Sequence, residues 1–363
     1  MTEFTLGVEE EFHLVDAASG SLRTAAPEVL AALGRREADE VDPELLRTQV
    51  EIQTPACAEL AEIRSHLGRL RSSLGANAAQ VGCRIAASGT WPGQTPPVPP
   101  TQEDRYEQIA ARFGPTAREQ TVCGAHVHVH VADRGLRMAA IRRARPWLAT
   151  LLAISANSPF WRGADTGYGS YRWQVWSRWP MAGAPPAVQS AEEYDQIVEA
   201  LLRTGVPRDE GMLYWDIREA RRFDTVEFRV ADVGARIEDT LLVAALVRAL
   251  VQTCVEAERE SRRCDDTRPE LIRVALWRAA RFGLTADLID PVTGSPAPVA
   301  DVVASLVEHV RTSLEEHGDL AFVRTGVEAL LAGGTGAERQ RAAFRPAGHM
   351  RDVVDLLVSE TSG

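Results

Sequence analysis

The chain has 363 residues, a net charge of −11 and 40 basic residues, every one of which is arginine. The acidic balance argues against a broad surface for nucleic acid or anionic lipid, so we expect no nucleic-acid partner and no membrane. The lack of lysine excludes P-loop proteins, protein kinases and Schiff-base enzymes, because each class needs a lysine amine.

Short strands alternate with helices over the first 155 residues. The hydrophobic patterns predict strands over residues 4–15, 46–53, 84–88 and 122–131, and helices over residues 27–36, 59–80 and 136–155. Segments 91–101 and 181–190 are rich in proline and glycine and are expected to be loops. The first loop is a candidate lid over a site, with a plain surface connection as the alternative. Residues 160–179, dense in Trp, Tyr, Gly and Arg, are expected to be irregular.

The chain changes character near residue 231. Strands over residues 213–218 and 225–230, joined by a short polar turn, predict a hairpin. Helices are then predicted over residues 240–262, 269–282 and 299–317, followed by two short C-terminal helices. Strands before residue 231 and helices after it favour an α+β fold with a mainly antiparallel sheet. We expect one domain over residues 1–363, with a sheet-bearing part at 1–235 and a helical part at 236–363.

Four of the predicted strands share one pattern, an apolar face and a face of acids, imidazoles or guanidinium groups. Residues i and i+2 of a strand point to the same side. The polar faces carry Glu9 and Glu11, Glu51 and Gln53, the three histidines His126, His128 and His130, and the pair Glu227 and Arg229. A Glu-x-Glu strand alone is weak evidence, a strand with three alternating histidines is stronger evidence, and Glu10 and Gln53 are expected to be structural. Together the four patterns predict one site if the strands share a sheet.

Carboxylates that converge on one site repel each other unless a cation lies between them. A set with many carboxylates and few imidazoles suits Mg²⁺ or Mn²⁺ better than zinc. The three-histidine strand by itself would suit zinc, and a Glu-x-Arg strand is often only a cross-strand ion pair. Because the chain has no lysine, any phosphate it handles must be held by arginine or by metal ions.

Five segments carry a resemblance to a known family. Residues Leu6–Phe12, Val50–Pro55, Cys123–Val129, Trp215–Arg218 and Val226–Val230 resemble, in order and spacing, those of the glutamate–cysteine ligase type 2 family, also called carboxylate–amine ligases. The resemblance implies a catalytic fold similar to that of glutamine synthetase, with a curved, mainly antiparallel sheet of about six strands and helices on its outer face. It also implies ATP and Mg²⁺, with Mn²⁺ as a second ion.

The same resemblance implies roles for individual residues. The metal ligands would be Glu9, Glu11, Glu51, His126 and Glu227. Arg229 would contact the nucleotide phosphate, and Arg172 and Arg218 would contact phosphate or the substrate carboxylate, with Arg218 and Arg229 as the catalytic pair. His128 is a further candidate ligand. His130, Gln53 and the run Trp173–Trp176 depart from the forms expected in the family, and these departures are expected to reshape the pocket for the amine.

The implied activity is ATP-dependent amide formation through an acyl phosphate, with glutamate and cysteine as the first substrates to test and a homodimer as the expected assembly. A weak glutamate–cysteine ligase activity is compatible with the family. Two other classes fit the residues: a metal-dependent amide hydrolase that needs no ATP, and a non-catalytic nucleotide-binding relative. Cys123, near His126, is expected to be a buried small hydrophobe rather than a nucleophile.

The remaining features of the sequence bear on where in the cell the protein is located. The five cysteines form no CxxC pair and are expected to be reduced thiols. The N-terminus has no basic region before an apolar run, and the longest apolar stretch identified, residues 147–156, is too short to span a bilayer. We therefore expect a cytoplasmic protein.

Overall fold

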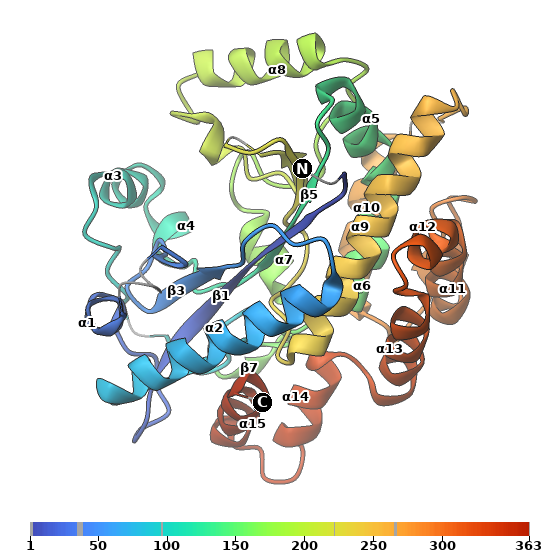
Figure 1. Cartoon of the computed structure of the whole chain (residues 1–363). Helices are drawn as coiled ribbons and strands as arrows, with labels where there is room; N and C mark the ends of the chain where they lie inside the picture. Colours follow the sequence, from blue (N-terminus) through green and yellow to red (C-terminus); the bar gives the residue numbers. More distant parts are fainter. Residues whose placement is uncertain (1–2, 35–38, 96, 221, 265–266, 363) are drawn as a thin grey trace.

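The computed structural model describes residues 3–34, 39–95, 97–220, 222–264 and 267–362, and a seven-stranded sheet lies at its centre (Figure 1). The strands run in the order β2-β3-β1-β5-β9-β8, β4 pairs with the second half of β1, and every pairing is antiparallel. The predicted α+β class is confirmed, with seven strands in place of about six. The strand bounds are β1 Leu6–Asp16, β2 Val41–Pro43, β3 Gln49–Gln53, β4 Cys83–Ala86, β5 Ala125–His130, β8 Ile217–Glu219 and β9 Thr225–Phe228.

The helices surround this sheet, and two small hairpins lie outside it. The hairpins are β6 Phe160–Trp161 with β7 Ala164–Asp165, and β10 Leu288–Ile289 with β11 Pro296–Ala297. The helices are α1 Ala26–Ala32, α2 Leu60–Gln80, α3 Asp104–Phe113, α4 Pro115–Arg118, α5 Arg134–Ala144, α6 Leu148–Ile154, α7 Tyr171–Trp176, α8 Ala191–Arg203, α9 Ile237–Arg259, α10 Pro269–Phe282, α11 Val299–His309, α12 Arg311–Glu316, α13 Leu320–Gly333, α14 Gly336–Phe344 and α15 Met350–Ser362.

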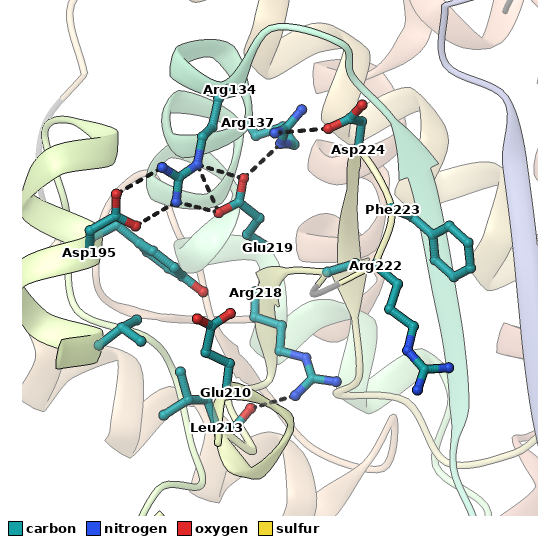
Figure 2. Close-up of a pocket in the computed structure, with 13 residues that line it drawn as sticks. Arg134, Arg137, Asp195, Glu210, Leu213, Arg218, Glu219, Arg222, Phe223 and Asp224 are labelled. Atoms are coloured by element: carbon teal, nitrogen blue, oxygen red, sulfur yellow. Dashed lines mark hydrogen bonds and ion pairs between the residues drawn. The ribbon is translucent and has the colours of Figure 1, made fainter. Parts of the chain in front are cut away.

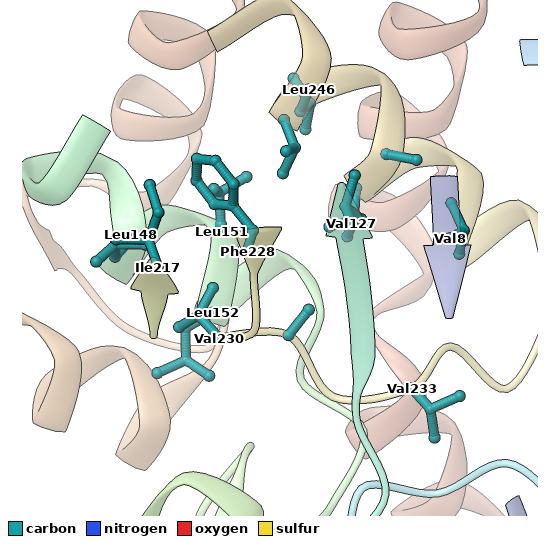
Figure 3. Close-up of a cluster of buried hydrophobic side chains, with 14 of the residues drawn as sticks. Val8, Val127, Leu148, Leu151, Leu152, Ile217, Phe228, Val230, Val233 and Leu246 are labelled. Atoms are coloured by element: carbon teal, nitrogen blue, oxygen red, sulfur yellow. The ribbon is translucent and has the colours of Figure 1, made fainter. Parts of the chain in front are cut away.

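The apolar face of the sheet is covered by helices. Helix α2 packs on β1 and β4, and α9 packs on β5 and β1, so that the two long helices cross the same face (Figure 1). Figure 3 shows Val127 and Phe228 of adjacent strands in the same cluster as Leu151 of α6 and Leu246 of α9. All four side chains are buried. Truncating a buried Phe to Ala in such a core costs about 3–5 kcal/mol, so this layer fixes where the strands lie.

Helix α9 is the longest helix among the described residues. Ile237–Arg259 is long and apolar enough to cross a membrane by length and composition, with a mean hydropathy of 1.6 in its most apolar window. The expectation that 147–156 is the longest apolar stretch was therefore wrong. In the structure, 83% of that window of α9 is buried against the strands and neighbouring helices, as expected for a core helix.

A buried ion pair ties the helical layer to the central strand. Glu10 of β1 and Arg71 of α2 are both almost fully buried, and Arg71 Nη2 lies 2.6 Å from Glu10 Oε1. Arg71 Nη1 also donates to the carbonyl oxygen of Ala235, and Thr240 Oγ1 donates to Glu10 Oε1 at 2.5 Å. The interpretation of Glu10 as structural agrees with these contacts, because its carboxylate is fully engaged on the face that packs under the helices.

Several element predictions were wrong in detail. The helix expected over 136–155 is interrupted at Pro146, where a 3-10 turn, Arg145–Trp147, separates α5 from α6, because proline removes a helical hydrogen bond. The helix expected over 299–317 divides at Val310 into α11 and α12, and the C-terminal end contains α13, α14 and α15 rather than two helices. Strand β2 and helices α3, α4 and α8 lie in segments without a prediction. The expected end of the first helix, at residue 36, lies outside the described residues.

The helical part of the chain contacts the sheet-bearing part at several places. Helix α9 packs on α5, α2, β5 and β1, and α15 packs on β4 and α2. These contacts support the prediction of one domain over residues 1–363, which stays a prediction.

Candidate active site

The polar face of the sheet brings all the predicted strand residues together. The antiparallel registers set Glu11 opposite Glu51, Glu9 opposite His126, and Glu227 opposite both His128 and Arg218. Directly opposed residues point to the same face. The five predicted metal ligands and both predicted catalytic arginines therefore lie on one surface, at the opposite side of the sheet from the apolar core.

Two histidines and one carboxylate form the centre of this surface. His126 Nδ1 lies 2.9 Å from Glu9 Oε2, and His128 Nε2 lies 3.3 Å from Glu9 Oε1. His126 Nε2 is 3.6 Å from Glu11 Oε1. The Nε2 atoms of His126 and His128 are buried and make no hydrogen bond within the described structure. A buried ring nitrogen without a hydrogen bond is costly, so His126 Nε2 is suited to a ligand that the protein does not itself supply, whereas His128 Nε2 has the carboxylate of Glu9 beside it.

Three groups of side chains could each hold a cation, because their ligand atoms lie within 4.8 Å of one another. They are Glu9, Glu51 and His126; Glu9, His128 and Glu227; and Glu11, Glu44 and Glu51. His128 therefore joins the candidate ligands. Glu44 was missed in the sequence, because it follows the short β2, which has no alternating pattern, and is an isolated acid beside Pro43.

The electrostatics of the carboxylates fit a cation in this region. Burial raises the pKa of Glu11 to about 8, and the charge of Glu44 adds to this rise. Burial, together with Glu9, Glu44 and Glu11, raises the pKa of Glu51 well above its usual value. Burial also opposes the ionisation of Glu9, but the nearby His128 and His126 hold its pKa well below the ordinary range. A divalent ion would relieve the repulsion among these acids, and the predominance of oxygen ligands favours Mg²⁺.

Two arginines hold Glu227 on the same surface. Arg218 Nε donates to Glu227 Oε2 at 2.7 Å and Arg218 Nη2 donates to Oε1 at 3.1 Å, while Arg229 Nη1 also donates to Oε1. Although Glu227 is buried, the charges of Arg229 and Arg218 hold its pKa far below the usual range. Glu227 is therefore an anion that also fixes the two guanidinium groups in place.

Arg172 is buried close to Glu11 of this surface, and its charge acts to lower the pKa of that carboxyl, against the larger effect of burial. The side chain is 2% exposed, and its Nη2 donates to the carbonyl oxygen of Arg229 at 3.2 Å. A Cβ atom at Gly124, directly before β5, would approach Arg172 Nη2 to 2.2 Å, so a larger side chain there would collide with the buried guanidinium group. Arg172 does not line the cavities at the polar face of the described structure, and its predicted contact with phosphate or substrate stays a prediction.

The polar face opens into a central cavity of about 290 Å³. Beyond the predicted residues Glu9, Glu51, His126, His128, Arg218, Glu227 and Arg229, its wall includes Glu44, Arg105, Gly211, Ala220, Arg222 and Phe223. The cavity thus combines a carboxylate cluster with four arginines. Arg105 and Arg222 were missed in the sequence, because each stands in a segment without a recognisable pattern.

Three further cavities share lining residues with the central one. One of about 300 Å³ extends past His128 to His130, and one of about 180 Å³ extends past Glu44 to aromatic rings. A cavity of about 340 Å³ lies beyond Arg218 (Figure 2). In Figure 2, the guanidinium group of Arg134 bridges Asp195 and Glu219, while Arg218 and Arg222 lie at the other end. This ion-pair network supports the β8–β9 hairpin that carries Arg218 and Glu227.

The cysteines take no part in this surface. Cys123 Sγ is 3.6 Å from His13 Nδ1, but the thiol is fully buried and burial raises its pKa well above the usual value. The structure agrees with the interpretation of Cys123 as a small core residue. All five cysteines are free thiols, as predicted.

Comparisons with known proteins agree with this site. Residues 5–360 match the model of the family described as glutamate-cysteine ligase family 2. A protein of Frankia alni named "Putative glutamate--cysteine ligase 2-2" is 45% identical over 372 residues, which cover 99% of this chain and 97% of the relative. A protein of the same name from Mycolicibacterium vanbaalenii is 44% identical over 353 residues, covering 97% of this chain and 96% of the relative.

Two solved structures share the fold. A bifunctional glutathione synthetase from Pasteurella multocida matches with a TM-score of 0.74 at 17% identity, and the match covers 99% of this chain but 52% of that chain. A glutamate–cysteine ligase from Francisella tularensis, solved in complex with AMP, matches with a TM-score of 0.71 at 13% identity over 100% of this chain and 90% of that one. The chain belongs to glutamate–cysteine ligase family 2 and is an ATP-dependent ligase that joins a carboxylate to an amine.

Proposed function

We propose that the polar face of the sheet is the active site of this ligase, with glutamate as the first candidate for the activated acid and Mg²⁺ as the ion. The observation that carries the proposal is the convergence of Glu9, Glu11, Glu51, His126 and Glu227 on one face, with His126 Nε2 buried and without a hydrogen bond, next to Arg218 and Arg229. Glu44 and His128 complete the ligand set. When bound, the ion neutralises charge on the ATP phosphates and on the transferred phosphoryl group.

The reaction proceeds in two displacements. A carboxylate oxygen of the acid attacks the γ-phosphorus of ATP, the bond from this phosphorus to the β–γ bridging oxygen breaks, and ADP leaves. The amine nitrogen then attacks the acyl carbon of the acyl phosphate, the bond from carbon to the phosphate oxygen breaks, and the amine loses a proton as inorganic phosphate departs. Protein groups contribute by position and charge, with no covalent nucleophile.

Arg229 and Arg218 have the positions for charge stabilisation. Both line the central cavity, and both are held by Glu227, so each guanidinium group is oriented before a substrate binds. Preorganised donors of this kind stabilise developing charge without the cost of reorientation. Glu227 therefore acts both as a candidate ligand and as the group that positions the two arginines.

Membership of a ligase family supports ligation over the metal-dependent amide hydrolase and over the non-catalytic nucleotide-binding relative. Cysteine is named as a substrate only in the names of the relatives. Cytoplasmic location and a homodimer also belong to the proposal. Size-exclusion chromatography with light scattering would measure the assembly directly.

The test is ADP release in the presence of ATP, Mg²⁺, glutamate and a panel of amines. We expect ADP release that requires both an acid and an amine and that is lost in Glu51→Gln. Glu107→Gln is the matched control, because it makes the same change at an exposed position of α3 outside the ligand groups. Amide hydrolysis without ATP, or tight nucleotide binding without turnover in any acid and amine combination, would contradict the proposal.

A further inference from the structure

The smaller cavity beside the central one has a wall of aromatic rings. Trp176, Trp179 and Tyr214 form a connected cluster, with ring centroids 5.0 Å apart for Trp176 and Tyr214 and 5.1 Å apart for Trp179 and Tyr214. Tyr106 and Ile109 of α3 line the same cavity, whose volume is about 180 Å³. Trp176 belongs to the run Trp173–Trp176 that departs from the expected family pattern, and Trp179 follows it directly after α7.

This aromatic cavity and the central cavity adjoin each other. Glu44, Arg105, Gly211 and Arg229 line both of them. The guanidinium group of Arg229 also lies over the ring of Trp176, with Cζ 5.7 Å from the ring centroid. Arg229 in turn donates to Glu227 of the central site. A molecule whose ring fills the aromatic cavity can therefore extend its polar end to the place where the acyl phosphate would form.

Buried polar atoms without a hydrogen bond line this cavity, two as acceptors from Gln49 and Gln120 and two as donors, Trp179 Nε1 and Arg229 Nε. Gln49 and Gln120 line it and are each 2% exposed, and their Oε1 atoms have no hydrogen-bond partner in the described structure. Each Nε2 already donates to a backbone carbonyl, that of Val122 for Gln49 and that of Thr116 for Gln120, so the orientation of both amides is fixed. Such oxygens accept N–H groups and do not stabilise a carboxylate.

Charges of both signs lie at the boundary of this cavity. Arg105 is paired with Asp209, and Arg229 with Glu227, while the carboxylates of Glu11 and Glu44 line the cavity as well. An amine in the cavity therefore finds hydrogen-bond acceptors in the two glutamine oxygens and the two carboxylates.

The size of the cavity points to a ring. A dry protein cavity of about 150 Å³ holds benzene, so about 180 Å³ accommodates a six-membered ring with a short linker. The CH₂–SH group of cysteine would leave most of this space unfilled and would forgo contact with the rings. We propose that this cavity binds the amine substrate through an aromatic ring, so that the preferred amine carries a benzene-sized ring rather than the side chain of cysteine. The inference rests on the proposed function, since it takes the occupant to be the amine that is joined.

Binding can be measured without turnover. Isothermal titration calorimetry of the full chain, with Mg²⁺ and a non-hydrolysable ATP analogue present, would compare phenethylamine with ethylamine and phenylalanine with cysteine. Burial of a phenyl ring predicts Kd values roughly tenfold to a hundredfold lower for the ring-bearing member of each pair. Equal Kd values within either pair would overturn the proposal.

Two variants and one matched control locate the binding. Ile109→Phe fills the cavity, and Tyr214→Ala removes part of a half-buried wall, so each should raise the Kd of phenethylamine at least tenfold and leave that of ethylamine within about twofold. Ala111→Phe adds the same ring at an exposed position of α3 and should change neither value. Unchanged binding of phenethylamine in both cavity variants would place the ring elsewhere and overturn the proposal.

Turnover then separates the two proposals. ADP release with ring-bearing amines in preference to cysteine supports both. ADP release with cysteine as the better amine, together with no ring preference in binding, overturns the aromatic cavity and leaves the ligase proposal standing. A ring preference in binding without ADP release for any acid would overturn the proposed function and leave the cavity assignment standing.

Discussion

Glu10 and Glu11 are neighbours on β1, yet they lie in opposite electrostatic surroundings. Glu10 points to the helical layer, where Arg71 and Thr240 engage its carboxylate. Glu11 points to the polar face, where its neighbours include Glu44 and Glu51, and where it accepts one hydrogen bond from the backbone of Gly124. One carboxylate is thus neutralised within the fold, whereas the other lies among like charges.

The difference shows which face serves stability and which serves function. A buried carboxylate with an arginine partner completes the core, while a cluster of carboxylates without enough cations destabilises the fold until a ligand binds. Proteins tolerate such local conflict where a site requires it. The alternation of a single strand is sufficient to separate the two roles by one residue.

The largest expected effect is on stability, from removal of the cation on the helical face. In Arg71→Met, Glu10 remains buried without its partner, and we expect the free energy of unfolding to fall by about 3–5 kcal/mol. Urea denaturation followed by circular dichroism measures this loss. Activity per folded molecule should change little, because Arg71 does not line a cavity at the polar face.

Arg69→Met on the same helix is the matched control. Arg69 pairs with Glu40 at 2.7 Å, but both side chains are partly exposed, so the loss should stay below about 1 kcal/mol. Equal losses of unfolding free energy in the two variants would contradict the assignment of the buried Glu10–Arg71 ion pair as important for stability.

The next largest expected effect is on catalysis, from replacing the carboxylate of Glu11 by an uncharged amide. We expect Glu11→Gln to lower kcat/KM for ADP release by about 100-fold, because a candidate ligand beside the transferred phosphoryl group is lost. The metal-free protein should become more stable at pH 8, since an amide removes one member of the repelling cluster and can still accept from Gly124. Steady-state kinetics and urea denaturation of the same preparation measure both changes.

A variant that lost activity and stability together would contradict this account. It would mean that Glu11, like Glu10, is needed to hold the fold, and the contrast between the two faces would fail.

Much of the fold and site could be predicted from local patterns. Period-two alternation located β1, β3, β5 and β9, and it set Glu9, Glu11, Glu51, His126 and Glu227 on one face of them. Such alternation is visible because the opposite face is apolar. The family resemblance then supplied the chemistry that the pattern alone left open between several metal-dependent classes.

The missed features depend on contacts between distant segments. Glu44 and Arg105 follow no alternation, and Tyr214 stands in the strand predicted over residues 213–218 without a predicted role. Only the folded chain brings the segment after β2, α3 and the segment before β8 to the same cavity. Arg172 was noticed in the sequence, because it stands in an aromatic run, but its contacts could not be predicted. Its guanidinium group donates to the backbone carbonyl oxygens of Arg229 and Val230. A break such as that at Pro146 was visible in the sequence, but hydrophobic periodicity continued across it.

A smaller catalytic effect is expected at Glu44, which belongs to one candidate ligand group and to the boundary between two cavities. In Glu44→Gln, we expect the Mg²⁺ concentration for half-maximal ADP release to rise about tenfold, with kcat at saturating Mg²⁺ nearly retained. Glu107→Gln, at an exposed position of α3, is the control. A fall in kcat without any change in the Mg²⁺ requirement would exclude Glu44 as a ligand.

The smallest expected effect is the pH dependence that Glu11 imposes on the metal-free fold. Burial and Glu44 raise the pKa of Glu11 to about 8, above its unfolded value near 4.5. Such a group stabilises the fold fully below the unfolded pKa, and the contribution is lost as the pH rises through the folded pKa. Between pH 7 and pH 9 the metal-free protein should therefore lose about 1 kcal/mol through this residue.

Thermal denaturation at pH 7, 8 and 9, with EDTA or with Mg²⁺, measures this dependence. The increase in Tm on adding Mg²⁺ should grow with pH, because the ion binds the ionised carboxylate and must displace a proton at the lower pH. In Glu11→Gln, the Tm increase on adding Mg²⁺ should grow less steeply with pH, because the contribution of Glu11 is lost. Glu51, whose pKa is also raised, accounts for the pH dependence that remains. A Tm increase that is independent of pH in the unmodified protein would contradict this prediction. It would show that the carboxylates of the polar face are already fully ionised at pH 7. The negative charge of Glu11 would then be balanced by partners within the fold, as that of Glu10 is.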